Sequence, residues 1–136
     1  MLPLEFVVTG TPVSHQSHNK IRLRAWQEQV RQAAREAMPS EEAPVTTDCL
    51  LVAVYFFGSP PVLLDNDNFI KPFQDALIGV VYQDDKQVTD TFIRRTDIGG
   101  RFRIPGRSRR LVDAIEQGQE FVYIRVEEAP SHEEVP

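Results

Sequence analysis

The sequence contains a single cysteine, Cys49, which excludes an intramolecular disulfide. Its surroundings, DCLLVAVYFF, predict a buried strand position rather than a reactive thiol. The chain also lacks any stretch near the roughly 20 apolar residues that span a bilayer. Its first residues, MLPLEFVVTG, lack the basic leader and long apolar run of a secretory signal. We therefore expect a cytoplasmic protein with no membrane partner.

An excess of positive charge is absent as well, because the formal net charge is −5. The charges are nevertheless segregated: of 15 Lys and Arg residues, five lie within 20–35 and seven within 94–110, while four acids lie from residue 127 onward. Affinity for polyphosphate follows the local field, so a basic surface on an acidic protein can bind nucleic acid. We predict phosphate contacts for the arginines of the second cluster, which are Arg94, Arg95, Arg101, Arg103, Arg107, Arg109 and Arg110.

The chain has 136 residues, of which 41% are hydrophobic, and this is enough to bury one core. Strands are expected over 4–8, 49–57, 88–95 and 121–126, and the second of these is apolar on both faces, which is typical of the middle of a sheet. Strands that alternate with helices predict an α+β or α/β fold. We expect one domain over 1–126 and an acidic, disordered tail over 127–136.

Three helices are expected between these strands. Apolar residues recur at three- and four-residue steps over 21–38. A second helix carries Phe69 and Phe73, with Asp67 or Asn68 as its cap and Pro72 near its first turn, where a missing N–H costs little. This helix is expected to end at Gly79, and a third helix to run from a cap at Ser108 to a stop at Gly118.

The segment 65–88, DNDNFIKPFQDALIGVVYQDDKQV, contains five Asp and two Lys. Ionised carboxylates are the natural ligands of hard cations such as Mg²⁺ or Mn²⁺. Asp65 and Asp67 are two residues apart, so in an extended segment they point to the same side. Asp-x-Asp pairs also occur in haloacid-dehalogenase phosphatases and in glycosyltransferases, for which this chain is too short.

The other charged residues of the segment complete a candidate catalytic site. Helical spacing places Lys71 and Asp75 on one side of the second helix, while Asp84 and Asp85 follow in a turn. A bound cation lowers the pKa of a water molecule and stabilises the oxygen leaving phosphorus. Lys71 either neutralises charge developing at phosphorus or simply pairs with Asp75.

The pattern Asp65-x-Asp67-Asn68-x-x-Lys71-x-x-x-Asp75-Ala76-Leu77, then Gly79, then Asp84-Asp85-x-Gln87-Val88, resembles RusA-type Holliday junction resolvases. The likeness also includes Gly10, Pro12 and Ser14 and the basic helix, and it spans most of residues 3–126. It implies a RusA-like nuclease domain over 1–126, an α+β single domain in which a mixed β-sheet packs with about three helices. The implied metal ligands are Asp65, Asp67 and Asp85, with Lys71 assisting and Asn68, Asp75 and Asp84 supporting.

The resemblance also implies an activity and a partner. The expected enzyme is a homodimeric, Mg²⁺-dependent endodeoxyribonuclease, with Mn²⁺ as a substitute, that makes paired symmetric nicks in a four-way DNA junction during recombination and repair. Alternatives are a non-cleaving protein that binds branched DNA, a nuclease that prefers flaps or forks, and a small-molecule phosphohydrolase.

Overall fold

The computed structural model describes residues 2–39, 42–58, 64–100 and 108–136. Four strands of this part form one sheet in the order β1-β4-β2-β3, accompanied by three α-helices. The predicted α+β class with a mixed sheet is therefore confirmed. The elements in chain order are β1 (Leu4–Thr9), α1 (Lys20–Ala37), β2 (Cys49–Phe57), α2 (Asn66–Ala76), the 3₁₀ helix η1 (Asp85–Gln87), β3 (Val88–Asp97), α3 (Arg109–Gln117) and β4 (Phe121–Glu128).

Strand β2 lies inside the sheet, as its double-sided apolar sequence predicts. It pairs antiparallel with β4 and parallel with β3, whereas β1 pairs antiparallel with β4. The parallel β2–β3 pair needs a crossover connection, and α2 forms the helical part of it. The acidic segment is therefore the crossover of a β-α-β unit.

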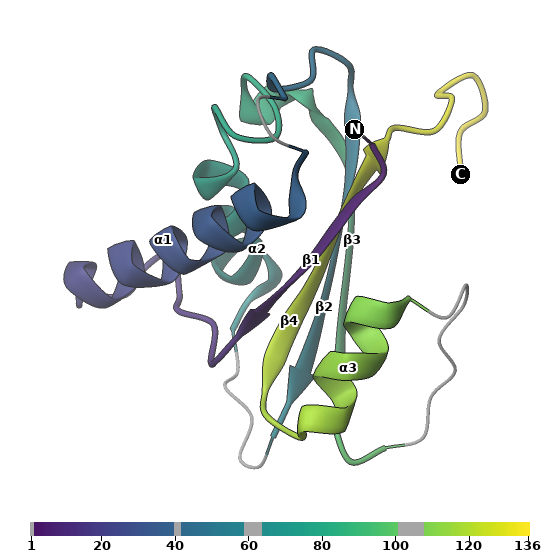
Figure 1. Ribbon diagram of the computed structural model, residues 1–136. Coiled ribbons are helices and arrows are strands. Elements are labelled where there is room, and N and C mark those ends of the chain that lie inside the picture. The colour runs from purple at the N-terminus through teal and green to yellow at the C-terminus, as the bar shows by residue number, and fades with distance from the viewer. Residues whose placement is uncertain (1, 40–41, 59–63, 101–107) are drawn as a thin grey trace.

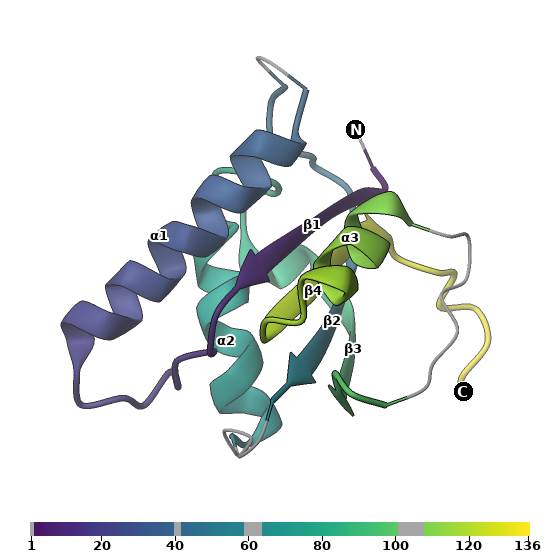
Figure 2. The ribbon, with the colours of Figure 1, turned by 60° about the horizontal axis from the view of Figure 1, so that its bottom comes forward.

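Helices cover both faces of the sheet. Helices α1 and α2 lie on one side and α3 on the other (Figures 1 and 2). The side chains of β2 alternate accordingly: Leu51, Ala53 and Tyr55 belong to the larger core beneath α1 and α2, and Phe56 packs with Ala114 and Phe121 beneath α3. This alternation is the period-two pattern of a strand buried on both faces.

Helix α2 begins earlier than its sequence suggests. Asp65 occupies the N-cap position, so the capping prediction for Asp67 and Asn68 is wrong, and both residues lie within the first turn. Pro72 lies six residues after Asn66, inside the helix rather than near its first turn. Proline leaves the carbonyl four residues earlier without its usual partner. Here the backbone N–H of His15 donates to the Asn68 carbonyl at 2.9 Å, which supplies the missing bond from outside the helix.

Helix α3 confirms the expected cap and stop. The Ser108 hydroxyl accepts a hydrogen bond from the Leu111 N–H, and Gly118 ends the helix with a left-handed φ of 70°. The same hydroxyl donates to the carboxylate of Glu5 on β1, which also accepts from the Tyr123 hydroxyl at 2.6 Å. Burial, followed by this hydrogen bond, raises the pKa of Tyr123 to about 12. The cluster fastens α3 to β1 and β4.

The boundary expected between domain and tail lies too early. Strand β4 continues through Glu128, so the first two residues assigned to the tail belong to the sheet. Beyond it, the Ala129 N–H donates to the Asp48 carbonyl, and His132 lies 2.6 Å from a carboxylate oxygen of Asp90. Disorder over the remaining tail stays a prediction. The expected loop positions Ser59, Pro60 and Pro61, and the loop residues 101–106, lie outside the described residues.

Replacement of Phe73 by alanine should strongly destabilise the fold. Phe73 is fully buried and makes edge contacts with Trp26 and Phe69, at ring-centroid distances of 5.8 and 5.5 Å. We expect Phe73→Ala to lower the free energy of unfolding by about 3–5 kcal/mol in urea titrations. Phe92→Ala is the matched control, because that ring is 43% exposed and should cost less than about 1 kcal/mol. Equal losses would contradict this assignment of the core.

Candidate active site

Two aspartates stand at the start of α2. Asp65 is the N-cap residue, yet its carboxylate makes no capping hydrogen bond, and Asp67 follows in the first turn. Both are exposed, and among the described residues neither carboxylate has a hydrogen-bond or ion-pair partner. The N-terminal end of a helix favours negative charge. These two carboxylates are thus available to a ligand.

Lys71 connects α2 to the 3₁₀ helix η1. Its Nζ lies 2.9 Å from Oδ1 of Asp75, one helical turn onward, and 2.8 Å from Oδ2 of Asp85. The turn that carries Asp85 therefore meets the helix at Lys71. The pairing of Lys71 with Asp75, expected as its alternative role, coexists with the contact to Asp85.

The Lys71–Asp85 contact stabilises the charged form of both groups. The hydrogen bond from Lys71, reinforced by one involving Asp84, holds the pKa of the Asp85 carboxyl below its usual value. Hydrogen bonds to Asp85 and then to Asp75 raise the pKa of the Lys71 ammonium. Lysine and aspartate are consequently both ionised at neutral pH.

Asp84 and Gln87 hold the turn that presents Asp85. The Asp84 carboxylate accepts from the Lys86 N–H at 2.9 Å, and the Gln87 side chain accepts from the N–H groups of Gln83 and Asp84, which closes a capping box. The Gln87 amide also donates to the carbonyls of residues 45 and 47. Gln87 is a positioning residue to which the sequence analysis assigned no role. The spacing Asp84-x-x-Gln87, an acidic residue followed by Gln at the third position, is the signal that could have revealed it.

Helix α2 is held in place by contacts with β2, with α1 and with the turn that follows it. The Phe69 ring stacks on Tyr55 of β2 at a centroid distance of 6.0 Å. From α1, Arg31 Nε donates to the carbonyl of Ala76 at 3.3 Å, and from the following turn the Tyr82 hydroxyl donates to the carbonyl of Gln74 at 2.6 Å. The helix that carries the charged residues is therefore a rigid element rather than a loose loop.

The donor chemistry of the site suits a hard cation. Asp65 and Asp67 offer carboxylate oxygens that no other described side chain occupies. Asp85, in contrast, is already engaged by Lys71. No three His, Cys, Asp or Glu side chains of the described residues are gathered closely enough to hold a metal ion. The structure thus brings Lys71, Asp75 and Asp85 together but does not gather the three expected ligands.

The predicted phosphate-binding arginines occupy different environments. Arg94 is exposed, with its guanidinium 5.0 Å from the centroid of the Phe92 ring. Arg95 is half-buried and turns toward α2. Arg109 and Arg110 begin α3, where Arg109 pairs with Asp113 at 3.2 Å. The other predicted contacts, Arg101, Arg103 and Arg107, lie outside the described residues.

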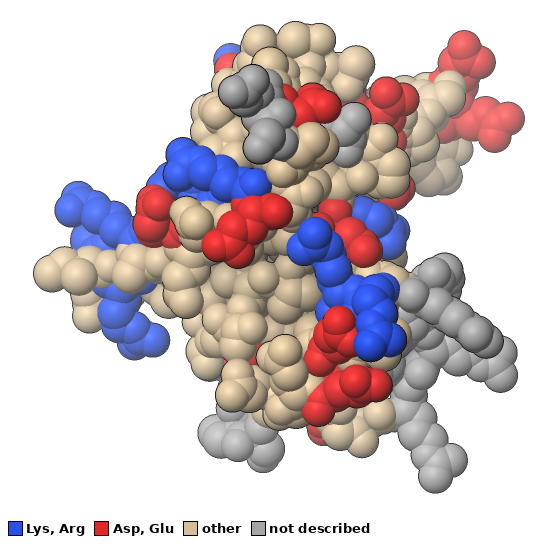
Figure 3. Space-filling model, viewed as in Figure 1, with Lys and Arg blue, Asp and Glu red and all other residues tan. Residues whose placement is uncertain are grey.

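Charges of both signs share the face drawn in Figure 3. Lys and Arg side chains gather over the N-terminal part of α1 and near β3, and Asp and Glu side chains lie between them (Figure 3). Acidic and basic groups are therefore interspersed on this face.

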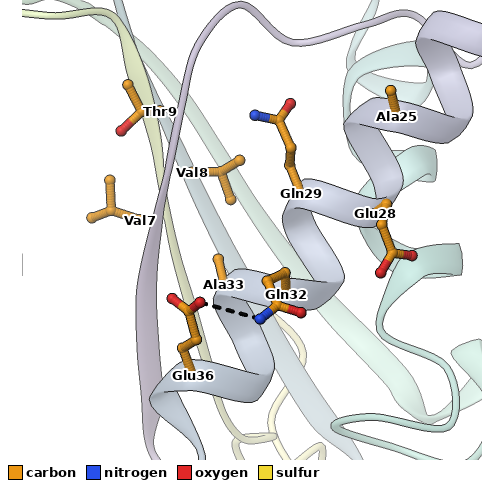
Figure 4. A pocket seen from close by; sticks show the side chains of 9 residues that line it. All are labelled: Val7, Val8, Thr9, Ala25, Glu28, Gln29, Gln32, Ala33 and Glu36. Carbon is orange, nitrogen blue, oxygen red and sulfur yellow. Dashed lines mark hydrogen bonds between the residues drawn. The ribbon is translucent and has the colours of Figure 1, made fainter.

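A cavity of about 550 Å³ lies elsewhere, between β1 and α1 (Figure 4). Its lining includes Val7 and Val8 from the strand and Gln29 and Gln32 from the helix. No residue of the acidic segment 65–88 lines it. We therefore place the candidate site at the charged surface of α2 rather than in this cavity.

The α+β fold thus presents two exposed aspartates at the N-terminus of α2 and an aspartate that is paired with a lysine. The chain matches the model of the family Endodeoxyribonuclease RusA over residues 8–105. It belongs to this family of endodeoxyribonucleases, and the match includes the whole acidic segment. This confirms the resemblance seen in the sequence. A comparison with curated proteins found no match.

No helix among the described residues has the length and the apolar character needed to cross a membrane.

Replacement of Lys71 by methionine should raise the pKa of Asp85 toward its ordinary value, because the largest cause of the lowering is removed. In the wild type, the stability from the lowered pKa is present above the ordinary carboxyl pKa of about 4 and is lost as the pH falls through the lower folded value. The stability advantage of wild type over Lys71→Met should therefore shrink between about pH 5 and pH 3. Carboxyl ¹³C NMR and urea titrations measure the two effects.

Lys86→Met is the control for this experiment. Lys86 follows Asp85 directly but is the last of the causes that lower its pKa. A rise in the pKa of Asp85 that is as large in Lys86→Met as in Lys71→Met would contradict the assigned role of the Lys71–Asp85 contact.

Proposed function

We propose that this protein is a Mg²⁺-dependent endodeoxyribonuclease that resolves four-way DNA junctions by paired symmetric nicks. It acts as a homodimer in the cytoplasm, in DNA recombination and repair. The observation that carries the proposal is the pair of carboxylates of Asp65 and Asp67 at the start of α2, which have no partner among the described residues and lie in the same segment as the Lys71–Asp85 contact. All four residues lie within the segment matched to the family of endodeoxyribonucleases.

The residues that would hold the cation are Asp65, Asp67 and Asp85. Mg²⁺, or Mn²⁺ in its place, supplies an acidified water and stabilises negative charge on the phosphate oxygens when it is bound. Asp85 enters this set through its contact with Lys71, which keeps its carboxylate ionised at neutral pH. Asp84 supports the set indirectly, since it caps the turn on which Asp85 stands.

Lys71 has a second task at the scissile phosphate. Its ammonium is partly exposed between Asp75 and Asp85, so it can offset charge that develops on phosphorus oxygens. Asp75 orients this ammonium. Asn68 supports the site through its carbonyl, which ties the first turn of α2 to the backbone of His15.

A dimer follows from the symmetry of the substrate. Two nicks at symmetric positions of a junction need two active sites, and a two-fold assembly provides them at equivalent places. A purely binding role is disfavoured, because carboxylates placed beside phosphate would repel it without a cation.

Asp67→Asn should abolish junction cleavage and preserve junction binding. The amide keeps the shape of the side chain but removes the charge that attracts a cation, so we expect the cleavage rate to fall by about 100-fold or more. Labelled four-way junction, flap and linear duplex are incubated with and without Mg²⁺, and binding is measured in EDTA. Paired cuts confined to the junction are expected for wild type.

Asp48→Asn is the matched control, since Asp48 is exposed but lies outside the acidic segment. Equal cleavage by wild type and Asp67→Asn would refute the catalytic assignment. Faster cutting of flaps than of junctions would refute junction selectivity, and binding without any cutting would identify a non-cleaving protein.

Removal of basic residues near α3 should weaken DNA binding and flatten its salt dependence. Each phosphate contact contributes about 0.9 to the slope of log K against log salt, so the triple replacement Arg107→Ala, Arg109→Ala and Arg110→Ala should reduce the slope by about 3. Fluorescence anisotropy at several salt concentrations measures this. Arg125→Ala is a control, because Arg125 is paired with Glu127 and lies outside both basic clusters of the sequence. An unchanged slope in the triple variant would sink the proposed contacts.

A further inference from the structure

Arg94 and Arg95 are neighbours in β3 whose side chains leave opposite faces of the sheet. Arg94 lies opposite Val54 and Arg95 opposite Tyr55 of β2. Tyr55 belongs to the core beneath α1 and α2, so Arg95 faces α2, whereas Arg94 lies against Phe92 on the other face. Two residues of identical chemistry therefore have different surroundings.

Arg95 contacts the residue that precedes the first turn of α2 and an aromatic ring at the end of that turn. Its Nη2 donates a short hydrogen bond to the carbonyl of Leu64, the residue directly before Asp65. Its guanidinium carbon lies 5.9 Å from the centroid of the Phe69 ring. The Phe69 N–H donates in turn to the Asp65 carbonyl at 2.9 Å, which is the first hydrogen bond of the helix. Arg95 thus holds the short segment that contains Asp65 and Asp67.

This contact supplies what the helix lacks at its N-terminus. The Asp65 side chain makes no capping hydrogen bond and has no other partner among the described residues, so the first turn lacks a usual source of rigidity. A positive charge is unfavourable near a helix N-terminus. For the Arg95 guanidinium, the negative charges of Asp65 and Asp67 offset this unfavourable interaction. A guanidinium is planar and keeps its geometry when it both donates to a carbonyl and lies near a ring, which an ammonium does not reproduce.

We propose that Arg95 is a positioning residue for the cation ligands Asp65 and Asp67, and that Arg94, not Arg95, is the member of this pair that contacts DNA. The inference rests on the proposed function, because it takes these aspartates as ligands. It separates two arginines that the sequence placed in one class.

The test measures Mn²⁺ binding to the DNA-free protein by isothermal titration calorimetry. Loss of a residue that orients metal ligands typically weakens metal affinity about 10- to 100-fold, and we expect this for Arg95→Ala. Arg95→Lys should recover only part of the loss. Arg94→Ala, the matched control, should leave Mn²⁺ affinity unchanged and weaken junction binding in EDTA, whereas Arg95→Ala should not weaken that binding.

Hydrogen exchange gives a readout that does not depend on metal. The Phe69 amide should exchange faster in Arg95→Ala and at the wild-type rate in Arg94→Ala, because only the first variant loses the anchor at Leu64. Thermal unfolding identifies a variant that fails to fold, in which case Arg95→Lys carries the comparison.

The outcomes separate this inference from the proposed function. Equal Mn²⁺ affinity and equal Phe69 exchange in wild type and Arg95→Ala, with weaker Mn²⁺ binding by Asp67→Asn, would overturn the role of Arg95 alone. Weaker junction binding in EDTA by Arg95→Ala, with Mn²⁺ affinity unchanged, would make it a DNA contact. Equal Mn²⁺ binding by wild type and Asp67→Asn would overturn the metal site and the positioning role together.

Discussion

The parallel pairing of β2 with β3 is the constraint on which the site depends. Parallel neighbours cannot be joined by a tight turn, so the chain must leave the sheet after Phe57 and cross one of its faces before it returns at Val88. Helix α2 and the turn η1 lie on this crossover, and all five aspartates of the acidic segment lie on it too. The topology that builds the sheet therefore also carries the chemical groups to one face of it.

Within the crossover, contacts of three kinds make the charged residues rigid. Aromatic packing of Phe69 on Tyr55 attaches α2 to the sheet, and the His15 N–H compensates for the bond that Pro72 cannot make. Lys71 then links the helix to Asp85. Each link joins segments distant in sequence, so loss of any of them would disturb the placement of the carboxylates without removing one.

Much of this architecture could be predicted from local sequence. The apolar run over 49–57 is long, lies on both strand faces and is bounded by polar residues, so the position and central place of β2 followed directly. Ser108 and Gly118 marked the ends of α3 because capping and left-handed turns have strong residue preferences. The motif of the acidic segment identified the family, which the match over residues 8–105 confirms.

The predictions that were wrong depended on contacts with residues distant in the sequence. Pro72 was expected near a helix start, and nothing near it in the sequence indicates that a backbone N–H from residue 15 satisfies the Asn68 carbonyl. The end of β4 was placed early because Glu127 and Glu128 are polar, although pairing with β2 holds both in the sheet. Arg94 and Arg95 are adjacent in β3, so their side chains leave opposite faces of the sheet, and the pairing with β2 shows which face each one occupies.

The charge of the crossover explains why a net acidic protein can still act on DNA. Five Asp and two Lys leave the segment with three uncompensated negative charges, and Arg95 adds one positive charge from β3. Lys71 neutralises its neighbours Asp75 and Asp85 in part, whereas the carboxylates of Asp65 and Asp67 have no partner among the described residues and keep their attraction for a cation. A divalent ion bound there would offset the remaining repulsion of an approaching phosphate. Part of the acidic excess therefore belongs to the candidate site and does not oppose a nucleic-acid substrate.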